Sequence, residues 1–258
     1  ENLEITLHQH ALTITDSLDD QIHISYHPSI SANHDLVTNQ NDKTLSLTDK
    51  KLSESPFLSS GIGGILHIAS SYSIRFEEVI LQVPKGRSLK GINVSTNRGQ
   101  TTIINASLEN ATLNTNGYLL RIEGSRIKNS KLTTPNIVNI FDTDLTDSQL
   151  ESTEHHVHAE NIQVHGKVEL MAKTDLQLLL SEEEKQRINL DLSTKHGSIL
   201  HFLREGRRSF KNKENKNERL SNPYKTEKAD AKDQLIARAD QDIYLLKSEE
   251  HESSSRNR

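Results

Sequence analysis

The residue types in this chain that could do chemistry are histidine, aspartate and one group of basic side chains. His155, His156 and His158 lie close together. If Val157 points inward, His156, His158 and Glu160 share an outer face, where imidazoles spaced i and i+2 could bind Zn²⁺. The spacing fixes no third ligand, so solvated histidines are the favoured interpretation. We therefore predict no metal and no cofactor, and we leave open whether these histidines bind anything.

Three aspartates, Asp142, Asp144 and Asp147, come nearest to what a polysaccharide-processing enzyme needs. Such enzymes use paired carboxylates as acid and base, or an acidic cluster that holds Ca²⁺. Asp147 falls at an expected turn and Asp144 precedes an expected inward leucine, so structural roles account for both. Phosphate-binding loops, Ser-His-Asp elbows and His-Glu-x-x-His helices are missing from the sequence. We predict that the chain is not an enzyme, with a carbohydrate-active β-helix enzyme as the less favoured alternative.

Residues 204–223 combine basic side chains with many asparagines and almost no apolar residues. The pattern predicts a flexible loop, and a merely solvated loop is the favoured interpretation. A cationic segment on an acidic body could also contact teichoic acids, anionic lipid head groups or an acidic protein, without inserting into lipid. The candidate residues for such an anionic partner are Arg207, Arg208, Lys211, Lys213, Lys216 and Arg219.

The composition excludes several classes of protein. The 258 residues include 31 Lys and Arg, 36 Asp and Glu and no cysteine, for a net charge of -5. A disulfide scaffold, a cysteine nucleophile and a thiolate metal site are therefore excluded. The near-neutral balance argues against nucleic acid as a partner, and no apolar run approaches the ~18 residues of a membrane span. Because the chain begins with Glu1, we expect a processed or truncated chain that has lost a signal or anchor.

Short strands must position these residues. Apolar residues alternate with polar ones in pieces such as 3–7, 22–24 and 45–47, which are separated by clusters of Asn, Asp, Ser and Gly. This pattern predicts an all-β protein with little or no helix. The segment 181–185 is interpreted as a charged turn between two further strands.

Residues 88–160 repeat in frame about every 18 or 19 residues. Three apolar columns recur, namely Leu89, Leu108, Ile127 and Leu145; Val94, Leu113, Leu132 and Leu150; and Ile104, Ile122, Ile140 and Val157. Three further columns hold turn-formers, small residues and hydroxyls, namely Gly91, Asn110, Asn129 and Asp147; Ala111, Ser130 and Ser148; and Thr96, Thr115, Thr134 and Ser152.

These columns predict a β-solenoid with coils of about 18–19 residues. Coils stacked about 4.8 Å apart let each backbone group pair with the coil above or below. A column of Gly, Asn and Asp marks one corner, because these residues tolerate positive φ. A narrow interior also explains an aromatic content of only 4%. A sandwich or barrel is the main rival fold, but it does not require turn and hydroxyl columns in frame.

The repeat also predicts neighbours for the histidines. Counting back by one coil after another places Asn139 and Arg121 beneath His156. The same counting places Phe141 beneath His158. An adjacent arginine is a poor neighbour for a cation, which supports the prediction of no metal.

The sequence resembles the bacterial "putative adhesin" family of domains of unknown function. The resemblance is carried by Val79–Gly86, which ends in Pro-Lys-Gly, and by a Thr-x-x-Gly motif at Thr96 and Thr194, shortened at Thr115. The segment 239–245 is similar to that family's last coil, with Asp242 where Gly is usual. The resemblance implies a single-stranded β-helix-like fold, display outside the cytoplasmic membrane of a Gram-positive bacterium, and links to cell-envelope stress systems. It brings no catalytic residues.

We expect an N-terminal β region at 1–83 continuous with the solenoid, solenoid repeats at 84–203, a basic flexible loop at 204–223, a C-terminal strand or cap at 224–247, and a disordered tail at 248–258. The predicted function is a non-enzymatic, extracytoplasmic, surface or membrane-anchored module for adhesion, binding or envelope sensing. Its expected partners are a cell-wall polymer, an anionic envelope surface or another envelope protein. A self-assembling scaffold is the alternative.

Overall fold

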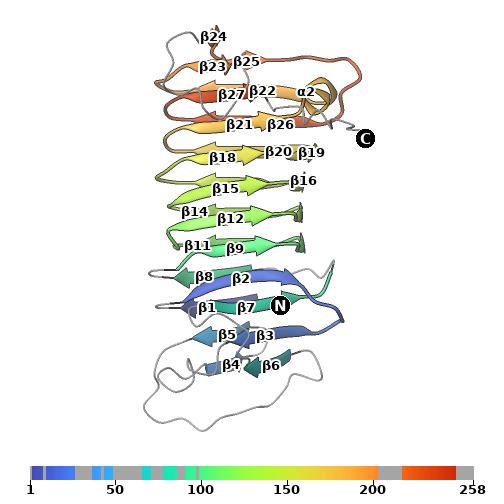
Figure 1. The fold of residues 1–258 in the computed structure, drawn as a ribbon, viewed down its shortest axis with the longest axis vertical. Coiled ribbons are helices and arrows are strands. Elements are labelled where there is room, and N and C mark those ends of the chain that lie inside the picture. The colour runs from blue at the N-terminus through green and yellow to red at the C-terminus, as the bar shows by residue number, and fades with distance from the viewer. Residues whose placement is uncertain are drawn as a thin grey trace, which may run out of the picture.

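The chain winds into a β-solenoid whose coils stack along one long axis (Figure 1). The computed structural model describes residues 2–7, 10–26, 37–41, 44–48, 66–70, 78–85, 91–96, 99–202 and 217–247. Neighbouring strands along the stack are mostly parallel, and a single short helix interrupts them in the part described. The predicted fold class is therefore confirmed.

The strands form three sheets that run the length of the stack or part of it. In spatial order, the eleven-stranded sheet contains β25 (Tyr224–Lys225), β22 (Asn189–Thr194), β26 (Gln234–Ala239), β20 (Lys167–Ala172), β17 (Gln149–Ser152), β14 (Lys131–Thr134), β11 (Thr112–Thr115), β8 (Gly91–Thr96), β1 (Asn2–Leu7), β5 (Thr44–Thr48) and β4 (Val37–Asn41). The four-stranded sheet contains β10 (Ser107–Glu109), β13 (Arg126–Lys128), β16 (Asp144–Thr146) and β19 (Gln163–His165).

The twelve-stranded sheet completes the wall of the solenoid. It contains β24 (Asn217–Leu220), β23 (Ile199–Phe202), β27 (Ile243–Lys247), β21 (Leu176–Leu180), β18 (Val157–Glu160), β15 (Ile137–Phe141), β12 (Leu119–Glu123), β9 (Thr101–Ile104), β2 (Ala11–Asp16), β7 (Glu78–Val83), β3 (Ile22–Tyr26) and β6 (Leu66–Ser70). The helix α2 (Glu182–Arg187) lies where a charged turn was expected at 181–185.

Residues with positive φ form the two corners on either side of the four-stranded sheet. One corner has φ values of 52° at Asn110, 47° at Asn129, 45° at Asp147 and 64° at Gly166. The other has 48° at Asn105, 58° at Gly124, 46° at Asp142 and 53° at Asn161. Asn, Asp and Gly adopt this left-handed conformation at low cost, so each column turns the chain at the same place on successive coils. The predicted turn column is confirmed from Asn110 to Asp147, and the second corner is new.

The small residues that follow these corners connect one coil to the next. Ser130 Oγ accepts a hydrogen bond from the N–H of Ala111 at 3.0 Å and donates to the carbonyl of Lys128 at 2.6 Å. Ser148 Oγ likewise accepts from the N–H of Ser130 at 3.1 Å and donates to Thr146 at 2.7 Å. A hydroxyl there satisfies backbone groups that a turn would otherwise leave unpaired.

The hydroxyl column caps the third corner, where each coil passes to the twelve-stranded sheet. Thr115, Thr134 and Ser152 are all buried, and Thr134 pairs with Ser152 as predicted. Thr115 Oγ1 accepts from the N–H of Gly117 at 3.3 Å, and Thr134 Oγ1 accepts from that of Asn136 at 3.2 Å. These side chains therefore fix the turn that starts the next coil.

The apolar columns form a narrow core. Leu108 pairs with Ile127, which pairs with Leu145, so the first column is confirmed over the described residues. The second column is continuous from Leu113 to Leu150, and all these side chains are buried. Stacking buries apolar side chains that one coil alone would leave exposed.

Two columns do not extend to the first repeat as predicted. Val94 pairs with Thr115 and Thr96 pairs with Leu7, so neither occupies its expected column. Gly91 starts β8 rather than forming a corner. Val94 and Ile103 are nine positions apart, whereas their register partners Thr115 and Ile122 are seven apart, which shifts the frame by one inward position.

The third column was also misplaced at both of its ends. Ile103, not Ile104, pairs with Ile122, and only Ile103 is buried. The start of the first column, Leu89, lies outside the described residues.

The other end of the third column is shifted by a longer turn. Ile140 pairs with Ala159, and not with Val157 as expected. Four residues, 153–156, join β17 to β18, whereas only 135–136 join the preceding pair of strands. Ala159 lies 19 positions after Ile140, within the repeat of 18 or 19 residues, whereas the predicted Val157 lies only 17 positions after it.

Towards each end of the stack, one coil is inserted between two other coils. At one end the inserted coil comes from the first residues of the chain, and at the other end it comes from residues 234–247. β1 lies between β5 and β8, and β2 lies between β7 and β9. At the opposite end, β26 lies between β20 and β22, and β27 lies between β21 and β23. The expected cap at 224–247 is therefore corrected, because its two long strands form an inner coil and β24 and β25 lie outside them (Figure 1).

Candidate interaction surface

The outer faces of the three sheets differ in polarity. Outward side chains of the four-stranded sheet are all polar or charged. On the eleven-stranded sheet, Met171 and Ile236 are the apolar residues among the outward side chains described. The twelve-stranded sheet instead has half-buried apolar residues on strand after strand, namely Ile80, Ile104, Leu119, Ile137, Phe141, Leu179, Leu200, Tyr244 and Leu246. Its outer face is therefore the candidate interaction surface.

Five side chains form a line across neighbouring coils of this face, which we call the outer row: Arg121, Phe141, His158, Gln177 and Tyr244. The Arg121 guanidinium lies 5.0 Å from the centre of the Phe141 ring, and the Phe141 and His158 ring centres are 5.5 Å apart. His158 Nδ1 lies 3.2 Å from Gln177 Oε1, and Gln177 is in register with Tyr244. The outer row thus offers ring faces, an amide and a phenol along the solenoid axis.

Acidic neighbours hold the ends of the outer row in place. Glu123 Oε2 accepts hydrogen bonds from Arg121 Nε at 3.0 Å and Nη2 at 2.6 Å, which orients the guanidinium over Phe141. Tyr244 donates its hydroxyl hydrogen to Asp242 at 3.1 Å. Burial, and then the negative charges of Asp242 and Asp175, raise the pKa of Tyr244 to about 12. Tyr244 therefore stays protonated at neutral pH, and with its hydrogen donated to Asp242 its hydroxyl oxygen can accept a hydrogen bond from a partner.

The histidine cluster lies beside the outer row. Val157 is buried and His158 and Glu160 point outward, as expected. The predicted stacking is corrected by two residues, because His158, and not His156, is in register with Asn139. Burial, and then the nearby charge of His155, lower the pKa of His156.

No group of three potential ligands for a metal ion occurs among the described residues. His158 Nε2 instead lies 3.4 Å from Glu160, and its ring packs on Phe141. In this arrangement His158 acts as a packing and hydrogen-bonding group.

The three candidate aspartates have structural partners. Asp142 accepts from Asn161 Nδ2 at 2.5 Å, and Asp147 accepts from the N–H of Lys167 at 3.0 Å. Asp144 lies 3.5 Å from Arg126 across the four-stranded sheet. Each carboxylate supports a corner or a neighbouring coil.

Most of the predicted anionic-partner contact is not described by the structure. Arg207, Arg208, Lys211, Lys213 and Lys216 lie outside the described residues. Arg219 lies on β24, where its side chain is exposed. The contact of this segment with an anionic partner stays a prediction.

The comparison with protein families gives a match over residues 1–246 to the model described as Toastrack DUF4097. The chain belongs to the Toastrack family. The resemblance inferred from Val79–Gly86 and the Thr-x-x-Gly motifs is thereby confirmed, and the family is one of unknown function. A crystal structure of a "putative cell adhesion protein" from Clostridium sporogenes is similar to this chain, with 11% identity, coverage of 96% of this chain and 93% of that chain, and a TM-score of 0.31. None of the curated proteins matches.

The structure gives a physical reason for the Toastrack Thr-x-x-Gly motif. A Cβ at Gly99 would collide with the backbone of His10 and Ala11, and one at Gly197 would lie 2.5 Å from the carbonyl oxygen of Gln241. Both glycines therefore let a neighbouring coil approach closely. The motif marks the places where the two inserted coils, β1 with β2 and β26 with β27, contact the rest of the stack.

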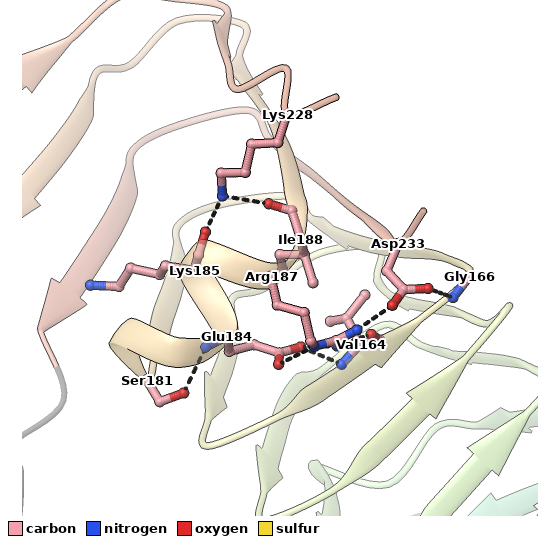
Figure 2. Close-up of polar contacts among 9 residues, drawn as sticks. All are labelled: Val164, Gly166, Ser181, Glu184, Lys185, Arg187, Ile188, Lys228 and Asp233. Carbon is pink, nitrogen blue, oxygen red and sulfur yellow. Dashed lines mark hydrogen bonds and ion pairs between the residues drawn. The ribbon is translucent and has the colours of Figure 1, made fainter. Parts of the chain in front are cut away.

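A polar cluster around α2 covers the β19 edge of the four-stranded sheet in this Toastrack domain. It was not expected from the sequence. Figure 2 shows Glu184 and Arg187 reaching from α2 to Val164 on β19, the last strand of that sheet. Glu184 Oε1 accepts from the N–H of Val164 at 2.7 Å, and Arg187 donates to its carbonyl. The two side chains replace the backbone groups of a further strand and cover an otherwise open edge.

The same cluster connects α2 to the segment that leads into β26. Asp233 accepts from the N–H of Gly166 at 2.7 Å and from Arg187, while Lys228 Nζ donates to the carbonyl of Ile188 at 2.8 Å (Figure 2). Burial opposes ionisation of Asp233, but these hydrogen bonds and the Arg187 charge keep its pKa below the usual value. No sequence signal indicates this cluster, because its members come from three separate segments.

No helix in the described residues is long and apolar enough to cross a membrane. The apolar character of this outer face, though not the row itself, could have been anticipated from outward residues such as Ile137 and Leu179. Sequence reasoning missed the row because it concentrated on titratable groups.

Proposed function

We propose that this Toastrack domain is a non-enzymatic binding module that acts outside the cytoplasmic membrane, in adhesion to the cell envelope or in sensing its state. The observation that carries this proposal is the concentration of half-buried apolar and aromatic side chains on one outer face. A monomer with no use for such a face would be expected to carry polar residues there, as the four-stranded sheet does.

The chemistry of the outer row favours an extended polymer of the envelope laid along the solenoid axis. Ring faces pack against the apolar faces of sugars or side chains, while Gln177 and Tyr244 provide hydrogen-bonding groups. The row advances by one side chain per coil, so a long partner meets a ring or a polar group at about 4.8 Å intervals. A cell-wall glycan fits this description better than a compact ligand would.

Co-sedimentation of the purified chain with isolated Gram-positive cell walls tests the proposal. We expect the wild-type chain to pellet with the walls and the double variant Phe141→Ser, Gln177→Ala to lose most of this binding. A matched double variant on the four-stranded sheet, Gln163→Ala, His165→Ala, should bind like wild type, because both residues are exposed away from the row. Wild-type protein that stays in the supernatant would contradict the proposal.

A charge-neutralisation experiment tests whether the outer row or the basic segment 204–223 provides the binding energy. Neutralising Arg207, Arg208, Lys211, Lys213 and Lys216 tests the predicted anionic contact at low and high salt. If teichoic acids provide the binding energy, this variant loses binding and added salt weakens wild-type binding strongly. If the outer row dominates, binding is nearly insensitive to salt.

A further inference from the structure

The coil formed by residues 234–247 occupies a slot between two coils that precede it in the chain. β26 pairs with β20 and with β22 over all six of its residues. β27 pairs with β21 over five residues and with β23 over three. Leu235, Ala237 and Ile243 are fully buried between the neighbouring coils. The slot is therefore complementary to this one segment in backbone register and in core side chains.

Contacts at both ends of the segment hold it in the slot. At its entry, Gln234 N–H donates to the carbonyl of Gly166 at 2.8 Å, and the carboxylate of Asp233 accepts from the N–H of the same glycine. At the turn, Asp240 lies 2.7 Å from Lys173 and 2.8 Å from Lys195, which belong to the coils on either side. None of these contacts depends on the path by which the segment reaches the slot.

The order of the chain leaves this slot open during synthesis. The coils 167–180 and 189–202 are complete before residues 234–247 exist, so both must wait with unpaired strand edges. Such edges pair readily with another strand of suitable register. Residues 203–233 connect β23 to β26, and this connection sets how strongly the chain's own segment competes with one from a second molecule.

We propose that residues 234–247 are an exchangeable coil, and that two copies of this chain associate by placing this segment in each other's slot. The exchanged pair has the same slot contacts as two monomers, and the pairing of β24 with β23 and of β25 with β22 is re-formed in the second copy along with them. Exchange of identical elements costs little for this reason. The proposal does not rest on the proposed function, although the exchanged segment carries Tyr244 of the outer row.

Cysteine cross-linking tests the exchange, because the chain has no cysteine of its own. Glu169 and Ile236 are register neighbours on β20 and β26, both directed outward. Parallel neighbours about 4.8 Å apart lie within the range that a disulfide spans. The pair Thr133→Cys, Glu151→Cys on β14 and β17 is the matched control, since exchange leaves these strands in one molecule.

The full chain is partly unfolded in urea, refolded at low and high protein concentration, and oxidised. We expect the Glu169→Cys, Ile236→Cys protein to give a covalent dimer on a non-reducing gel, in a fraction that rises with concentration. The control pair should run as a monomer on the gel even where light scattering finds twice the 29.1 kDa mass. Cross-links confined to single chains at every concentration would overturn the proposal.

A third variant addresses the entry contacts. Asp233→Asn weakens the bonds from Gly166 and Arg187, and should lower the urea concentration at which dimers form. Asp230→Asn, at an exposed position in the same connecting segment, should leave it unchanged. Equal urea dependence in both variants would count against exchange through opening of this coil.

Discussion

Left-handed corner residues decide where each coil turns, and one of them is a glycine for a steric reason. Gly166 has a φ of 64°, and a Cβ there would collide with the carboxylate of Asp147 on the preceding coil. The other members of this corner, Asn110, Asn129 and Asp147, carry side chains at φ values of 52°, 47° and 45°. The corner column therefore contains one position with a stricter requirement than the rest.

Replacing Gly166 with alanine is expected to lower the free energy of unfolding by about 1–2 kcal/mol, the cost of a left-handed L-residue. Displacement of the Asp147 carboxylate adds to this cost. Asn129→Gly is the control, and should change stability by less than about 0.5 kcal/mol because both residues accept this conformation. Urea unfolding followed by circular dichroism measures both. Equal stability of Gly166→Ala and wild type would show that the corner tolerates a Cβ.

Asp240 provides a pH dependence at the residue scale. Hydrogen bonds from Lys173 and Lys195 lower the pKa of Asp240 from 3.8 to about 2. Because the folded pKa is depressed, the carboxylate contributes stability above the unfolded value, and this contribution is lost as the pH falls through about 2. We expect Asp240→Asn to be less stable than wild type near neutral pH and equally stable near pH ~2.

Urea unfolding at several pH values between these limits measures the difference. The double variant Lys173→Met, Lys195→Met removes the partners and should reproduce the pH profile of Asp240→Asn. A stability difference between wild type and Asp240→Asn that stays constant down to about pH 2 would contradict the ion-pair explanation.

At the scale of elements, α2 serves as a substitute for a strand. Glu184→Ala leaves the Val164 N–H without its acceptor on α2, which should cost about 1–3 kcal/mol and speed hydrogen exchange of that amide. Glu183→Ala in the same turn is the control, since Glu183 is exposed and should change stability by only a few tenths of a kcal/mol. Unchanged exchange at Val164 in Glu184→Ala would mean that the edge is protected in another way.

The central strands could be predicted from the sequence because their neighbours in space lie 18 or 19 residues apart in the chain. Leu108 pairs with Ile127 and then Leu145 at these steps, and one corner residue recurs with them. The same reasoning failed at Val157, where a longer turn precedes the strand. It failed more completely at β26, since Val168 pairs with a residue 67 positions later. Long-range pairing leaves no periodic trace in one sequence.

The candidate site was less predictable than the fold. Outward side chains such as Phe141 and Gln177 are not constrained by stacking in the core, so their columns show no repeated residue type. The cluster around Arg187 depends on which coil lies above β19, and this follows from the intercalated topology. A sequence pattern can identify strands without identifying the order in which they stack.

For the whole molecule, the insertion of β26 and β27 between other strands predicts that their amides exchange slowly, although strands near a chain terminus ordinarily exchange fast. β26 and β27 are paired on both sides, whereas β24 is at the end of its sheet. We expect amides of β26 to exchange as slowly as those of the central strand β14, and amides of β24 to exchange much faster. Hydrogen–deuterium exchange with mass spectrometry measures all three. Fast exchange in β26 would show that the coil opens independently of the stack.

The repeated corners have a consequence for how such a molecule changes in size. Each central circuit, such as β12, β13 and β14, begins and ends at equivalent positions of the wall and meets its neighbours in the same register. Excising or duplicating one circuit therefore leaves both specialised ends intact and alters the rod by a fixed increment of about 4.8 Å. The length of the stack, and with it the length of its outer face, therefore changes in steps of one coil.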